Sequence, residues 1–228
     1  MLIAIDIETD TSAAAFDPTV PSGLDPRAAA ITHVCAVTSN SAGISEVVRA
    51  ADEFDDGERG LLGWLVSWLN GLGSGDVVIT WNGLFFDLPF IEVRCLLHGI
   101  ATPFRFISDP ALDIAPKYGP SPWFSIIAAL HPSASAGSWN TVVVDGIDAA
   151  APSKTVDMAP LLAPYAAEHG IKHSLGPVAQ YVLGIDDWKL NAAMLHTYAA
   201  DEIRRYVAAD ARNTLALYSW ASTAPPTC

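Results

Sequence analysis

The chain has 228 residues, of which 51% are hydrophobic and 16% are charged, so it can form a sizeable core and is not disordered throughout. Twelve Lys and Arg against 25 Asp and Glu leave a formal charge of −13, which excludes a basic coat for nucleic acid. The three cysteines are far apart and odd in number, so neither a disulfide framework nor a zinc site is expected. Asp6 and Glu8 interrupt the first apolar run, and no run approaches the roughly 18 residues of a membrane span. We therefore expect a cytoplasmic protein without a membrane partner.

In the first half of the chain, apolar patterning predicts a mixture of strands and helices. The aliphatic run at 2–7 is typical of a strand that is buried on both faces. Asn40-Ser41-Ala42-Gly43 is typical of a hairpin turn, and Asp55 or Asp56 can cap the helix that follows. The predicted strands are 2–7, 30–37, 44–48 and 77–81, and the predicted helices are about 58–72 and 87–99.

The second half is predominantly helical, apart from residues 100–153, which are rich in Pro, Gly, Ser and Ala. We expect one domain over 1–222 with a loop-rich insertion at about 100–153, and a frayed tail over 223–228. This half is predicted to contain a strand at 139–144 and helices at 159–168, 173–183 and 191–222, the last of which can break near Ala200. Strands with a hairpin, followed by alternating strands and helices, predict an α/β fold with a mixed sheet and helices on both faces.

The first chemical feature is a pair of acids at the end of the first predicted strand. Asp6 and Glu8 are two residues apart on the predicted strand. Because successive side chains point to opposite faces, both carboxylates project to the same face of the sheet. Like charges this close cannot both stay ionised in a buried place unless a cation compensates them. An acidic strand end at the surface is the alternative, and this pair alone does not exclude it.

Two further clusters lie in other predicted elements. Asp87 closes the segment 82–87 directly after a predicted strand, at the carboxyl end where open α/β sheets bind their ligands. The alternative is that Asp87 only caps a helix and that Asn82 only begins a turn. Tyr206 and Asp210 are four residues apart and share one helix face. A surface pair is the alternative here, although an inward, unpartnered carboxylate in this alanine-rich turn would be costly.

In combination and in this order, the three clusters resemble the motifs of the DEDD superfamily of 3′→5′ exonucleases, whose fold is ribonuclease H-like, with a mixed five-stranded sheet. The motifs are Asp6-Ile7-Glu8-Thr9, Asn82 through Asp87, and Tyr206 with Asp210. A tyrosine ahead of the last aspartate is similar to the tyrosine branch (DEDDy), which includes ribonuclease D and the proofreading domains of family-A and family-B DNA polymerases. Flanking segments such as Val156-Asp157-Met158 look most like the exonuclease domains related to family-B polymerases.

The resemblance implies a metal-dependent exonuclease that releases 5′-mononucleotides from the 3′ end of single-stranded DNA. Asp6 would bridge two Mg²⁺ ions, which Mn²⁺ could replace. Glu8 and Asp210 would complete the first metal site, and Asp87 would support the second. Tyr206 would orient the attacking water, because a phenol with its ordinary pKa of about 10 is a poor base at neutral pH.

The resemblance also implies contacts to the terminal nucleotides by Thr9, Asn82 and Phe86, through hydrogen bonds and stacking. For Phe86, core packing is the alternative. Because few Lys and Arg are present to displace counterions, we expect DNA binding to depend only shallowly on salt. Two bound divalent ions would leave a net charge of about −9.

Two other functions stay open. One is an RNA exonuclease of the ribonuclease D type, because nothing in the motifs reads the 2′-hydroxyl group. The other is a non-catalytic module that binds a polymerase on the same fold. A role in proofreading or repair would need a DNA polymerase acting in trans. The alanine-rich, lysine-poor composition is typical of a GC-rich genome, either bacterial or phage.

Overall fold

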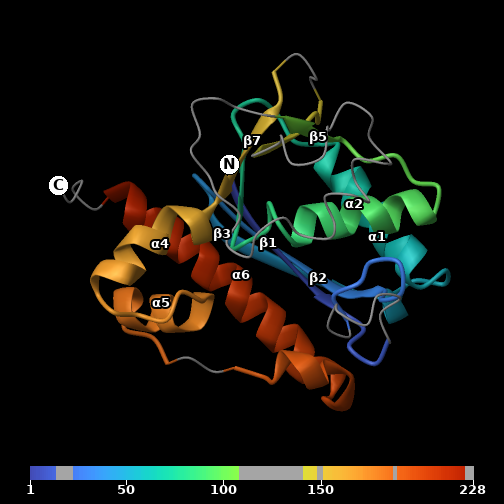
Figure 1. Ribbon diagram of the computed structural model, residues 1–228. Coiled ribbons are helices and arrows are strands. Elements are labelled where there is room, and N and C mark those ends of the chain that lie inside the picture. The colour runs from blue at the N-terminus through green and yellow to red at the C-terminus, as the bar shows by residue number, and fades with distance from the viewer. Residues whose placement is uncertain (14–22, 108–140, 148–150, 187–188, 224–228) are drawn as a thin grey trace.

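The computed structural model describes residues 1–13, 23–107, 141–147, 151–186 and 189–223 (Figure 1). Within these residues the chain forms a seven-stranded mixed sheet in the order β3-β2-β1-β4-β7-β6-β5. The strands are β1 Leu2–Thr9, β2 Ile31–Asn40, β3 Gly43–Ala50, β4 Val77–Thr80, β5 Phe104–Ile107, β6 Thr141–Val144 and β7 Ser153–Asp157. The helices are α1 Glu58–Leu69, α2 Asp87–Leu97, α4 Met158–Glu168, α5 Leu175–Leu183 and α6 Ala200–Thr223, with short 3₁₀ helices η1 Ala51–Glu53 and η2 Ala192–Thr197.

The predicted mixed sheet with helices on both faces is confirmed, but the structure describes seven strands where five were predicted. The two additional strands, β5 (Phe-Arg-Phe-Ile) and β7 (Ser-Lys-Thr-Val-Asp), lack the continuous run of β-branched residues that marks the equally short β4 and β6. β5 pairs with β6, so the segment predicted to be a loop-rich insertion extends the sheet at one edge. The rest of that segment, 108–140 and 148–150, lies outside the described residues, and so does most of the tail at 223–228.

One prediction about a helix end is wrong, and another is confirmed. Neither Asp55 nor Asp56 caps α1, because Gly57 occupies the N-cap position with a φ of 58°. Glycine reaches this positive φ without the steric cost of a side chain, so the chain enters α1 there. The predicted long helix over 191–222 is interrupted as expected near Ala200, and its first part is the 3₁₀ helix η2.

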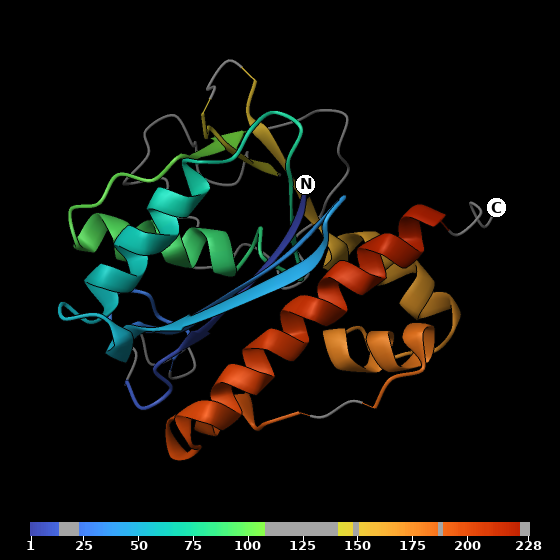
Figure 2. The same ribbon diagram turned by 180° about the vertical axis from the view of Figure 1, so that it is seen from behind.

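Successive side chains of β1 point to opposite faces of the sheet and pack into two separate hydrophobic cores. Ile3, Ile5 and Ile7 pack into the cluster beneath α1 and α2. Ala4 packs instead with α4, α5 and α6 on the opposite face. Figure 2 shows α6, in red, running along one side of the strands, with α1 and α2 on the other side. Because side chains alternate along β1, Asp6 and Glu8 share the face of Ala4, which is the face that α6 covers.

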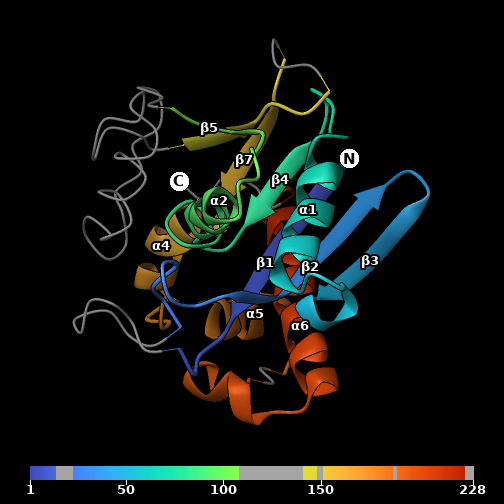
Figure 3. The same ribbon diagram turned by 90° about the vertical axis from the view of Figure 1, so that its right-hand side faces the viewer.

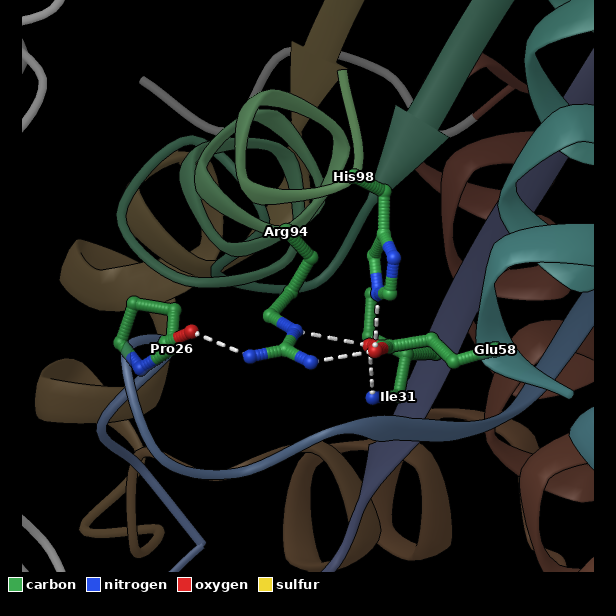
Figure 4. A network of polar contacts seen from close by, with 5 residues as sticks. All are labelled: Pro26, Ile31, Glu58, Arg94 and His98. Carbon is green, nitrogen blue, oxygen red and sulfur yellow. Dashed lines mark hydrogen bonds and ion pairs between the residues drawn. The ribbon is translucent and has the colours of Figure 1, made fainter. Parts of the chain in front are cut away.

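A buried polar network ties α1 and α2 to the start of β2 (Figure 4). The Glu58 carboxylate accepts hydrogen bonds from the Ile31 amide at 2.6 Å and from Arg94 Nε at 2.8 Å, and a second Arg94 nitrogen also contacts it. His98 Nε2 lies 2.8 Å from the same carboxylate, and Arg94 donates to the Pro26 carbonyl at 2.9 Å. Burial alone would raise the pKa of Glu58, but these donors hold it below its ordinary value of 4.5.

This network predicts an acid-sensitive contribution to stability. Because the folded pKa of Glu58 lies below its unfolded value, the contribution is complete above pH 4.5 and is lost as the pH falls through the folded value. We expect Glu58→Gln to lower the free energy of unfolding by about 2 kcal/mol near neutral pH, and by much less near about pH 3. Urea denaturation across this pH range checks this, and equal losses at both ends would contradict it.

Among the described residues, no helix is both long enough and apolar enough to cross a membrane.

Candidate active site

Asp6 and Glu8 lie on the part of β1 that extends beyond its pairing with β4. β1 and β4 are parallel, and their pairing begins at Leu2 with Val77 and ends at Ala4 with Ile79. Asp6 and Glu8 therefore lie beyond the end of that ladder, at the carboxyl edge of the sheet. The Glu8 side chain is buried, and Asp6 is partly accessible. Figure 3 shows this edge, with β1 between β2 and β4.

Asp87 reaches the same edge from the first turn of α2. One of its carboxylate oxygens accepts a hydrogen bond from the Ile7 amide at 3.2 Å. That amide lies between Asp6 and Glu8 on β1, so the bond brings Asp87 beside the first pair. Asp87 is only 3% exposed, and it is the first residue inside α2 rather than its cap, which is Phe86. The interpretation of Asp87 as a simple helix cap is therefore wrong.

α6 supplies Tyr206 and Asp210 from the opposite side. Both side chains are buried, at 6% and 7% exposure, so they are not a surface pair. They lie on the face of α6 that covers β1, among apolar residues such as Val207 and Ala211. The predicted clusters on β1, α2 and α6 thus meet in one place.

The four carboxylates lie close enough to repel one another electrostatically. Burial, and then the negative charges of the other three carboxylates, raises the pKa of Asp6 well above its ordinary value. Burial, followed by Asp210 and Asp87, does the same to the pKa of Glu8. Burial and the charges of Asp157 and Asp210 raise the pKa of Asp87 to about 7. Such a site favours the binding of a cation, because the cation would remove the repulsion.

Burial, followed by the charges of Asp210, Glu8 and Asp6, raises the pKa of Tyr206 above its ordinary value of 10. The phenol therefore stays neutral over any practical pH range. A neutral phenol can donate a hydrogen bond but cannot act as a base.

Lys189 is a member of this site that sequence reasoning missed. Its ammonium lies 2.7 Å from each carboxylate oxygen of Asp210 and 5.1 Å from the centre of the Tyr206 ring. Its positive charge also lowers the pKa of Asp6 and of Glu8, opposing the effect of burial. The one signal that could have found it is rarity, because the chain has only four lysines.

The donor set fits a hard divalent cation in ligand type and in charge, because it is made of carboxylate oxygens that repel one another. The side chains as placed do not enclose such an ion. Across the described residues, no three His, Cys, Asp or Glu groups surround a common metal position. Instead, the Lys189 ammonium is the cation that contacts Asp210.

The three predicted nucleotide contacts have different surroundings. The Thr9 hydroxyl donates to the Gly23 carbonyl at 2.6 Å, so this side chain is used within the fold. Phe86 packs against the core beneath α2, with its ring 5.4 Å from that of Phe90. Asn82 has a φ of 64°, and within the described part of the chain its buried Oδ1 has no hydrogen-bond partner. Of the three, Asn82 has the side-chain group that remains available to a ligand.

Comparison with solved structures supports the assignment of the fold. The chain is similar to a family B DNA polymerase from the hyperthermophilic archaeon Pyrobaculum calidifontis, with a TM-score of 0.57 and 18% sequence identity. The match covers 96% of this chain and 24% of that polymerase, so the chain spans about a quarter of its length. A mixed α/β sheet with this neighbour is consistent with a ribonuclease H-like fold. No family model and no curated protein matches the sequence.

Proposed function

We propose that the protein is a metal-dependent 3′→5′ exonuclease of the DEDDy type that hydrolyses single-stranded DNA from its 3′ end to 5′-mononucleotides. The observation that carries this proposal is the meeting of four carboxylates and a tyrosine, from β1, α2 and α6, at one edge of the sheet. The sequence motifs and the likeness to a family B DNA polymerase fold support it independently. Because the four carboxylates and the tyrosine come from three separate elements, the packing of the core alone does not explain why they meet.

The residues that would hold divalent cations are Asp6, Glu8, Asp87 and Asp210. When bound, Mg²⁺ or Mn²⁺ supplies a Lewis acid that activates water and neutralises charge at a phosphodiester. The chain's own groups supply position and polarity. Tyr206, held neutral and hydrogen-bonded to Asp210, would orient a water. Asn82 presents an acceptor that has no partner among the described residues, and Lys189 provides a cation beside Asp210.

The direct test of this proposal is a shortening assay with 5′-labelled oligonucleotides. We expect the purified protein with Mg²⁺ or Mn²⁺ to produce a ladder of shortened single-stranded DNA. The absence of shortening with either metal would contradict the proposal. If a protein without this activity co-elutes with a DNA polymerase, that result would instead support a non-catalytic module that binds a polymerase.

The preference for DNA over RNA is part of the proposal and needs its own comparison. Matched DNA and RNA oligonucleotides of one sequence, with equal labels, give the ratio of the two rates. We expect DNA to be shortened faster. A faster rate on RNA would favour the ribonuclease D type of activity instead.

For Tyr206 we predict a loss of rate without a change in the shape of the pH profile. Tyr206→Phe removes a neutral donor, so we expect the turnover rate to fall about 10- to 100-fold. Because the pKa of Tyr206 lies above the ordinary value for a phenol, its ionisation cannot produce an alkaline limb of the profile. Rates measured from mildly acidic to mildly alkaline pH check this. An alkaline limb that disappears in Tyr206→Phe would contradict it.

A further inference from the structure

The turn between β4 and α2 has an unusually constrained backbone. Asn82 is the one non-glycine residue with a positive φ in the described part of the chain. A side chain other than hydrogen at Gly83 would place its Cβ 2.4 Å from the Cβ of Thr80, so the turn is also closely packed. A left-handed conformation outside glycine costs free energy and persists only where the surroundings enforce it.

The carboxylate of Asp157 binds the backbone of this turn on both sides of Gly83. β4 and β7 are parallel neighbours, with Thr80 opposite Asp157, so Asp157 ends its strand beside the turn. Its Oδ1 accepts a hydrogen bond from the Asn82 amide at 2.6 Å, and its Oδ2 accepts one from the Leu84 amide at 3.1 Å. Asp157 is 2% exposed, so these charge-assisted bonds are shielded from water.

Asp157 also has an ordinary structural role. It is the N-cap of α4, where the same Oδ1 accepts from the Ala159 amide at 3.0 Å. A cap needs one such bond, and serine or asparagine can supply it. The two bonds across to the turn are additional to that role.

The turn between β4 and α2 connects Asp157 to the candidate site through Asn82 and Asp87. The backbone held by Asp157 places the Asn82 side chain with its buried Oδ1 unpaired among the described residues. The same turn continues into α2 through the hydrogen bond from Leu88 to the Gly83 carbonyl at 2.9 Å, and Asp87 lies between them. The Asp157 carboxylate therefore holds both Asn82 and the turn that leads into α2, the helix that carries Asp87.

We propose that Asp157 is a positioning residue that holds Asn82 in place to bind the terminal nucleotide. This inference rests on the proposed function, because it takes the 3′ end of a single strand as the ligand. Asp157 acts through the backbone of the turn and contacts no substrate itself.

The test separates the positioning role from the capping role. In Asp157→Ser the hydroxyl can still cap α4 but is too short to reach the turn. Binding of a fluorescent single-stranded oligonucleotide, measured by anisotropy with Ca²⁺ in place of Mg²⁺, is expected to weaken about tenfold. Asp76→Ser is the matched control, because Asp76 holds the turn at the other end of β4 through Gly73. We expect that variant to bind like the wild type.

A double-mutant cycle with Asn82→Ala decides whether Asp157 acts through Asn82. We expect Asp157→Ser to cause less than about a twofold further loss of binding once Asn82 is alanine. Losses that multiply, or a single variant that binds like the wild type, would overturn the inference while leaving the exonuclease proposal intact. A wild-type protein that neither binds nor shortens the oligonucleotide would reject both. If Asp157→Ser does not fold, the same cycle with Asp157→Asn should give a loss of about threefold that disappears in the Asn82→Ala background.

Discussion

Asp6→Asn is expected to reduce metal-dependent shortening of single-stranded DNA by about a thousandfold or more, and at the same time to stabilise the metal-free protein. The loss of activity follows because Asp6 is one of the carboxylates that would hold the divalent cations. The gain in stability follows because burial and three neighbouring carboxylates all oppose its charge. Removing that charge should raise the free energy of unfolding in EDTA by about 1–2 kcal/mol.

Opposite changes in activity and stability are what distinguish a functional site from a structural one. Asp145→Asn is the matched control, since Asp145 is paired with Arg105 at the surface and far from the candidate site in the sheet order. We expect it to change neither quantity appreciably. Rate assays and thermal unfolding in EDTA give both readouts from one preparation. An Asp6→Asn protein that is active, or that is less stable than the wild type, would contradict the assignment.

Lys189→Met is expected to destabilise the metal-free protein and to increase the stabilisation that divalent ions provide. Lys189 is ion-paired with Asp210 and offsets the charges of Asp6 and Glu8, so its removal leaves buried carboxylates without that cation. Breaking a buried pair costs about 3–5 kcal/mol, and because the Lys189 side chain is 30% exposed we expect about 2 kcal/mol.

The response to metal gives the sharper comparison. In the wild type a divalent ion that binds Asp210 would have to displace the Lys189 ammonium, whereas in Lys189→Met it would not. The increase in melting temperature on adding Mn²⁺ should therefore be larger in the variant. Lys154→Met, an exposed lysine on β7, is the control and should behave like the wild type. Equal increases in all three proteins would contradict the role given to Lys189.

Much of the fold could be predicted from periodicity. β1 was recognisable as a continuous aliphatic run, and α1 and α2 by their apolar spacing, because each element buries a regular face. The short strands β5 and β7 were missed because a charged residue interrupts each of them, whereas the equally short β4 and β6 are continuous runs of β-branched residues. The start of α1 was misassigned because aspartates are good caps, whereas the structure uses the positive φ of Gly57.

The residues of the candidate site could be predicted where their spacing within one strand or one helix places them on the same face. Asp6 and Glu8 alternate on a strand, and Tyr206 and Asp210 are one helical turn apart, so spacing alone placed them on one face. Lys189 lies outside the helices and strands, between α5 and η2, so no regular spacing relates it to the other residues of the site. The role of Asp157 was equally inaccessible, because it depends on the order of β4 and β7 in the sheet.

The most direct measurement of the central claim uses an oligonucleotide with a blocked 5′ end and a radioactive phosphate at its last internucleotide linkage. The account predicts that, with Mg²⁺, the label leaves first as a 5′-mononucleotide, before shorter fragments accumulate. It also predicts that EDTA or Asp210→Ala abolishes the release. Internal cleavage, release that persists in EDTA, or an unchanged rate in Asp210→Ala would contradict the assignment of this edge of the sheet as a 3′→5′ exonuclease site.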